Sequence, residues 1–108
     1  MADTGEQLIQ RVAQLAADCA PVDWSRIWIR AEVGEGSQES TYDFESPSAT
    51  RNWYEPPTPV QYEVNMSLLA LQRLMSESGK EPWNIAYLAL ERDGKFSLKF
   101  EYAPTTAA

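Results

Sequence analysis

The feature that most constrains the fold is the dipeptide Asp93-Gly94, which lies between two runs of alternating apolar and polar residues. This arrangement is a strong β-hairpin signal, because the turn needs a positive φ that glycine adopts without steric cost. Residues 85–90 and 96–102 are therefore predicted to be paired strands. One face of the second strand then carries Phe96, Leu98, Phe100 and Tyr102.

Two amphipathic helices are predicted upstream of this hairpin. Thr4 and Gln7 have the spacing of a capping box, and apolar residues then recur at helical spacing until Pro21. A second helix is predicted with Thr58 as its N-cap and with Gly79 as the left-handed residue that ends it. Its apolar stripe consists of Val60, Val64, Leu68, Leu71 and Met75.

Between the two helices the apolar period changes to two, which is typical of strands. Residues 24–33 are predicted as one strand, residues 34–37 as a turn, and residues 40–45 as the returning strand. Residues 51–54 are a candidate for a short third strand. The proline-rich segment 56–59 excludes further sheet pairing, because proline lacks the backbone donor.

The predicted order is therefore helix, two or three strands, helix, two strands. Consecutive strands joined by tight turns favour antiparallel pairing, and both helices must bury their apolar stripes against the sheet. We expect an α+β fold, with one mostly antiparallel sheet of four to five strands and both helices on one face. The 108 residues are expected to form a single domain, residues 1–108, with residues 1–4 and 103–108 as flexible tails.

The composition argues against most enzyme classes. The chain has no histidine and one cysteine, which excludes Ser-His and Cys-His nucleophile pairs and most zinc sites. The glycines do not form a phosphate-binding loop. We therefore predict no catalytic residue, no metal and no cofactor. A distant alternative is acid–base catalysis by Glu32 and Asp43, should these carboxylates approach each other across the hairpin.

The charge and the apolar runs restrict the partners. Sixteen acidic and nine basic residues give a formal net charge of −7, which repels nucleic acid and favours encounter with a basic protein. The longest apolar runs are too short to cross a bilayer, and residues 1–6 do not resemble a signal peptide. A cytoplasmic location is expected, because Cys19 cannot form an internal disulfide.

The candidate binding residues are aromatic side chains with acidic neighbours, a combination typical of protein-binding hot spots. Two interpretations stay open: these aromatics are exposed, or the connection 46–58 covers the second sheet face and buries Trp28 or Trp53 in a secondary core. The candidates are Trp28, Glu32, Glu35, Glu39, Asp43, Glu45, Trp53, Tyr54 and Glu55.

The chain also resembles the YezG-like family of bacterial immunity proteins. An N-terminal helix, a tryptophan leading into a strand (residues 24–33), a long helix and a final hairpin follow in the family's order. The similarity covers residues 5–33 and 63–102 in outline, and residues 34–62 fit least well. The C-terminal residues that carry it are Gly79, Pro82, Trp83, Gly94, Lys95, Phe96, Glu101 and Tyr102.

The resemblance implies a cytoplasmic antitoxin that binds the domain of a secreted polymorphic toxin and blocks its active cleft. The toxins of such proteins are often nucleases, whose basic clefts would suit an acidic inhibitor. The alternative is an adaptor or secretion chaperone that carries an effector without inhibiting it. In the first case, the hairpin acids and the segment Trp53-Tyr54-Glu55 are expected to contact the toxin.

Overall fold

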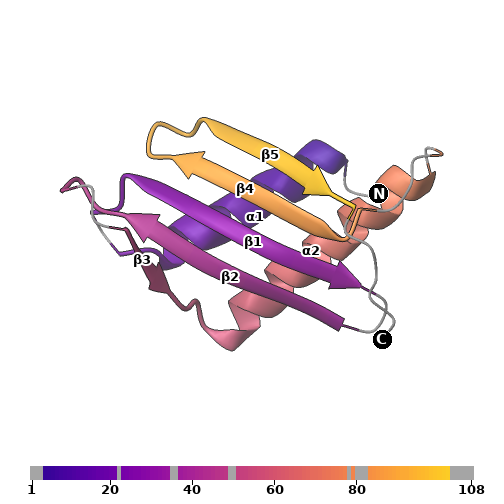
Figure 1. Cartoon of the computed structure of the whole chain (residues 1–108), viewed down its shortest axis with the longest axis horizontal. Coiled ribbons are helices and arrows are strands. Elements are labelled where there is room, and N and C mark those ends of the chain that lie inside the picture. The colour runs from indigo at the N-terminus through magenta and orange to yellow at the C-terminus, as the bar shows by residue number, and fades with distance from the viewer. Residues whose placement is uncertain are drawn as a thin grey trace.

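The computed structural model describes residues 4–21, 23–34, 37–48, 51–77, 79 and 83–102. The five strands form one antiparallel sheet in the order β3-β2-β1-β4-β5, and both helices cover the same face of it (Figure 1). The predicted α+β fold is confirmed, with its third strand. The elements are α1 (Gly5–Cys19), β1 (Arg26–Gly34), β2 (Ser37–Glu45), β3 (Arg51–Tyr54), α2 (Thr58–Glu77), β4 (Ile85–Glu91) and β5 (Phe96–Glu101).

Helix α1 begins at the predicted capping box. The Gln7 backbone N–H donates to Thr4 Oγ1 at 3.2 Å, and the Thr4 backbone N–H donates to Gln7 Oε1 at 2.8 Å. Two backbone donors of the first turn are thus satisfied by side chains. Thr4, predicted to belong to a tail, is therefore the cap of the helix. Residues 1–3 and 103–108, the rest of the predicted tails, lie outside the described residues.

Helix α2 begins one position earlier than predicted. Thr58 is its first helical residue and not its N-cap, since the Pro57 carbonyl accepts from the N–H groups of Val60 and Gln61. The Gln61 side chain donates to the Pro56 carbonyl at 2.6 Å, so it does not form a capping box with Thr58. Of the predicted stripe, Val64, Leu68 and Leu71 are buried and its two end residues are half-buried.

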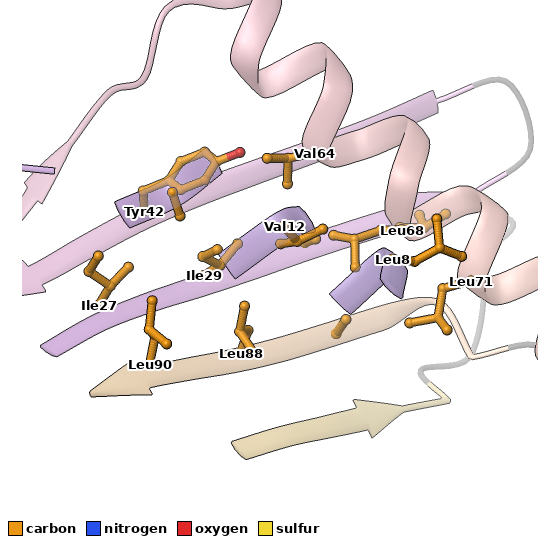
Figure 2. Packing of buried hydrophobic residues seen from close by; sticks show 14 of the residues in the cluster. Leu8, Val12, Ile27, Ile29, Tyr42, Val64, Leu68, Leu71, Leu88 and Leu90 are labelled. Carbon is orange, nitrogen blue, oxygen red and sulfur yellow. The ribbon is translucent and has the colours of Figure 1, made fainter. Parts of the chain in front are cut away.

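The core lies between the sheet and the two helices. Ile27 and Ile29 of the central strand β1 point to the helices together with Leu88 and Leu90 of β4 (Figure 2). The burial of β1 alternates strictly, so its intervening residues, Trp28 among them, lie on the opposite face. This opposite face, which no described helix covers, is called the open face below.

The two hairpins also differ slightly from their predicted forms. Strand β2 starts at Ser37 and not at residue 40, because pairing with β1 continues to Gly34 opposite Ser37. Strands β4 and β5 are joined by residues 92–95, and the Glu91 N–H donates to the Lys95 carbonyl at 2.8 Å across this connection. Gly94 has φ +94°, so the predicted need for glycine at this turn is confirmed.

Candidate functional site

The antiparallel register brings several of the predicted residues together on the open face. Trp28 of β1 lies opposite Asp43 of β2, and Asp43 lies opposite Trp53 of β3. On the other side of Trp28 the neighbouring residue is Ala89 of β4, followed by Ser97 of β5. One row across the sheet therefore holds two tryptophans separated by a carboxylate and bordered by two small residues.

Trp28 is half-buried under a side chain that sequence reasoning missed. The Arg51 guanidinium lies 4.2 Å from the Trp28 ring centroid and donates to Asp43 Oδ2 from Nε at 3.1 Å and from Nη2 at 2.8 Å. Arg51 thus combines a cation–π contact with an ion pair. The alternation of strand β3 was the available signal, because residues 51 and 53 share a face.

Trp53 and Tyr54 point to opposite faces of β3. The Trp53 side chain projects from the open face and is 74% exposed. Tyr54 lies on the helix side, where its hydroxyl donates to the Ala16 carbonyl at 3.0 Å. Burial raises the pKa of Tyr54 above its ordinary value. Trp53 is therefore available to a partner, whereas Tyr54 attaches β3 to helix α1.

The exposed Trp53 excludes one of the two interpretations left open for this residue. The segment after β2 does not fold over the open face as a lid. It adds β3 to the edge of the sheet, and Trp53 stays in solvent. Trp28 is covered only in part, by the polar Arg51 side chain and not by a secondary apolar core.

Three further acidic candidates, Glu32, Glu39 and Glu45, lie at the two ends of the open face. Glu32 and Glu39 are directly opposite each other on β1 and β2, near the turn between them. Two like charges in this position destabilise a sheet. Arg30 Nη1 lies 2.9 Å from Glu32 Oε1 and relieves part of the repulsion. A hydrogen bond with Tyr87, together with Glu32, raises the pKa of Arg30, which keeps its guanidinium charged.

At the other end, Glu45 of β2 lies between Arg26 of β1 and Arg51 of β3 in the register. Arg26 Nη2 is also 3.5 Å from Glu91 Oε1. The open face is therefore mixed in charge and not simply acidic, with its least compensated acids at the Glu32–Glu39 end. Of the remaining candidates, Glu55 is exposed beyond β3, and Glu35 lies outside the described residues.

Shallow recesses flank Trp28 on the open face. A recess of about 380 Å³ is bordered by Trp28, Arg30, Tyr87 and Lys99, and its floor includes Ala89 and Ser97. A second recess, of about 590 Å³, also borders Trp28, Ala89 and Ser97 and extends toward Arg26 and Lys95. Small side chains on β4 and β5 leave this space open beside the indole ring, so a partner's side chain can contact it.

The suggested carboxylate pair does not form. Glu32 lies opposite Glu39, whereas Asp43 lies opposite Trp28, four residues away along β1, or about 13 Å at the usual strand rise. The expectation that Glu32 and Asp43 approach each other is therefore wrong, because the register was not readable from the sequence. Within the described residues, there is also no cluster of three His, Cys, Asp or Glu side chains that could hold a metal ion. None of the described helices is long and apolar enough to cross a membrane.

Comparison with known proteins shows the family. The sequence model described as "Immunity protein YezG-like" matches residues 6–108. This chain belongs to the YezG-like immunity protein family. It is 26% identical over 113 residues to Immunity protein YezG of Bacillus spizizenii (94% of this chain, 70% of the relative). It is 25% identical over 109 residues to Immunity protein YezG of Bacillus subtilis (90% of this chain, 72% of the relative).

Membership of the YezG-like immunity family points to a toxin as the partner. The family match continues through residues 34–62, the segment in which the resemblance was weakest. Three of the residues that suggested the family have clear structural roles, whereas Pro82 lies outside the described residues. Gly79 and Gly94 have positive φ, and Trp83 is fully buried with its ring stacked 4.6 Å from that of Phe100. They specify the fold of a YezG-like protein and do not by themselves mark its binding surface.

Proposed function

We propose that this protein is the antitoxin of a polymorphic toxin system, acting without enzymatic activity in the cytoplasm of the producing cell. In this proposal it binds the domain of its cognate secreted toxin and inhibits it by occluding the active cleft. The observation that carries the placement of the interface is the open face, where the exposed Trp53 and Trp28 lie in one row on either side of Asp43, on a surface that no described helix covers.

The proposed interface has an aromatic centre and a charged border. Trp53 is the anchor, because a tryptophan buried on binding removes a large apolar area from water. Trp28 becomes a second anchor where a partner fills the recess beside it. Glu32 and Glu39 at one end of the open face, Glu45 at the other end and Glu55 beyond β3 attract lysines and arginines of the toxin cleft. Glu35, which lies outside the described residues, is proposed to act in the same way. A basic cleft of the kind found in nucleases matches both this border and the net charge of −7.

The toxin is sought in the protein encoded immediately upstream of this chain. Its C-terminal domain is induced in cells with and without this protein, and survival is scored. Rescue of the cells together with a complex that survives gel filtration supports an immunity protein. A complex without rescue supports the adaptor or secretion chaperone, which binds an effector and leaves it active. Absence of both rescue and binding contradicts the proposal.

Replacing the exposed tryptophan tests where the interface lies. We expect Trp53→Ala to weaken toxin binding by about 2 kcal/mol or more, roughly 30-fold in the dissociation constant, because an anchor residue loses its buried contacts. Isothermal titration calorimetry with the purified toxin domain measures this change. Tyr62→Ala is the matched control, since Tyr62 is a 63% exposed aromatic on helix α2, away from the open face. Equal effects of the two substitutions would refute this interface.

A further inference from the structure

Strand β5 forms an edge of the sheet, and no described segment lies beyond it (Figure 1). The bond from the Glu91 N–H to the Lys95 carbonyl shows which backbone groups point to β4. The direction of the backbone N–H and C=O groups alternates along an antiparallel pair. The backbone groups of Ser97 and Lys99 therefore bond to β4, and those of Phe96, Leu98 and Phe100 point away from the sheet. The outward backbone groups of these three alternate residues are thus available to pair with another strand.

The other edge of the sheet is protected. Strand β3 has four residues and is followed closely by Pro56 and Pro57, and both features discourage pairing with a further strand. Strand β5 has six residues and contains no proline. Phe96 is also 42% exposed, although it lies on the face that the helices cover elsewhere. The two edges therefore differ in strand length and in nearby proline, two properties that limit strand addition.

We propose that the occupant of this edge is a second copy of the same chain, paired antiparallel through β5 about a two-fold axis at Leu98. Leu98 then faces its own counterpart, and Phe96 faces Phe100 of the second copy. Both pairs use the outward-pointing backbone groups, as antiparallel hydrogen bonding requires. The side chains of these residues lie on the helix side, where they extend the apolar layer across the junction.

The charges on the other side of the strand fit the same register. Lys95 faces Glu101 of the second copy, and the symmetry forms this pair twice. Ser97 faces Lys99, so no like charges are opposed. An axis at Ser97 would instead oppose Lys95 and Lys99, and an axis at Lys99 would oppose that residue to itself. Charge complementarity therefore favours the axis at Leu98 over both of its neighbours in the strand.

The proposed pairing would join two sheets into one of ten strands. A two-fold axis normal to the sheet places the helices of both copies on one side and both open faces on the other. The proposed toxin-binding surface therefore stays accessible in the dimer. The self-association concerns the edge of the sheet alone, so it can be tested on the purified protein without any toxin.

The test exchanges the charges at Lys95 and Glu101 and measures the dimer dissociation constant of each variant. Sedimentation equilibrium at about 10 to 500 µM protein is suited to micromolar dimers. We expect the wild-type protein to dimerise, and Lys95→Glu or Glu101→Lys to weaken the dimer by about tenfold or more, because each opposes like charges twice. The double variant K95E/E101K restores the wild-type dissociation constant. Lys99→Glu is the control: it changes the net charge as Lys95→Glu does but faces only a serine.

A mixing experiment makes the test independent of any loss of stability in the single variants. An equimolar mixture of the Lys95→Glu and Glu101→Lys proteins restores both ion pairs, so we expect a mixed dimer tighter than either parent. Circular dichroism checks that each variant is folded. A wild-type protein that stays monomeric throughout the range overturns the proposal. A dimer whose dissociation constant is unchanged in the Lys95→Glu and Glu101→Lys variants overturns the proposal as well. So does a dimer that Lys99→Glu weakens as much as Lys95→Glu does.

Discussion

At the scale of single residues, the neighbours Trp53 and Tyr54 illustrate how a strand assigns opposite roles to adjacent aromatics. The Tyr54 ring lies 5.7 Å from the Tyr42 centroid and 5.9 Å from that of Phe44, and its hydroxyl reaches the Ala16 carbonyl. Tyr54 therefore connects the short edge strand to both β2 and α1. Trp53, one position earlier, is largely exposed, and in the proposed function it contacts the partner.

The hydroxyl of Tyr54 gives a prediction about stability. We expect Tyr54→Phe to lower the free energy of unfolding by about 1 kcal/mol, because the hydrogen bond to the Ala16 carbonyl is lost. Urea denaturation at neutral pH measures this difference. Tyr62→Phe serves as the control, since the Tyr62 side chain is largely exposed. A Tyr54→Phe protein as stable as the wild type would contradict the role given to this bond.

The same substitution alters the alkaline behaviour. Burial raises the pKa of Tyr54 and of Tyr42 in the folded protein above the ordinary value of 10.0. The unfolded chain therefore releases these protons first, and stability is lost as the pH rises above about 10, by up to about 1.4 kcal/mol per pH unit for each tyrosine. We expect a shallower decline in Tyr54→Phe, measured by urea denaturation between pH 9 and about 12.

At the scale of elements, the pairing of β1 with β2 contains an arrangement that stability alone does not explain. Glu32 and Glu39 face each other at a position where opposite charges would strengthen the sheet. A partly compensated acidic pair on the same face of the sheet as the exposed Trp53 is consistent with a surface adapted to a basic partner. The cost in stability is offset only in part by Arg30.

This arrangement predicts opposite effects on folding and on binding. We expect Glu39→Lys to raise the free energy of unfolding by about 0.5 kcal/mol, because it converts a repulsive cross-strand pair into an attractive one. The same variant should bind the toxin more slowly, since a border charge acts mainly on association. Thermal unfolding and stopped-flow association measure the two effects. Glu39→Gln removes the repulsion without adding a positive charge, so its stability and its association rate should lie between those of the wild type and of Glu39→Lys.

At the scale of the whole molecule, the net charge of −7 and the packing of both helices on one face of the sheet both bear on the proposed encounter with a partner. Both helices occupy one face of the sheet, so no described helix covers the other face (Figure 1). The formal charge sets a long-range field, whereas at the proposed interface the mixed charges of the open face would orient the partner.

The field of the whole molecule predicts a strong dependence of toxin association on salt. We expect the association rate constant to fall by about tenfold or more between roughly 50 and 500 mM salt, with a much smaller change in dissociation, because screening weakens steering more than contacts. Surface plasmon resonance with the toxin domain separates the two rates. An association rate independent of salt would argue against a basic cleft as the target.

Elements set by neighbouring residues could be predicted from the sequence alone. The capping box of α1, the positive φ of Gly94 and the alternation of β1 each depend on interactions within a few positions, and each is present in the structure. The strand period also separates Trp53 from Tyr54, although both were predicted to contact the toxin. The displaced start of α2 shows the limit, because a proline-rich segment offers more than one residue that can precede a helix.

The tertiary structure alone decided which residues meet across the sheet. Glu32 faces Glu39 and not Asp43, Arg51 lies over Trp28, and β5 is an edge of the sheet that the described residues form. These contacts join residues far apart in the chain, and a shift of register by two residues would satisfy the same alternation while changing every pair. The sequence by itself therefore determined the elements and their faces, and long-range pairing determined the surface on which the proposed function depends.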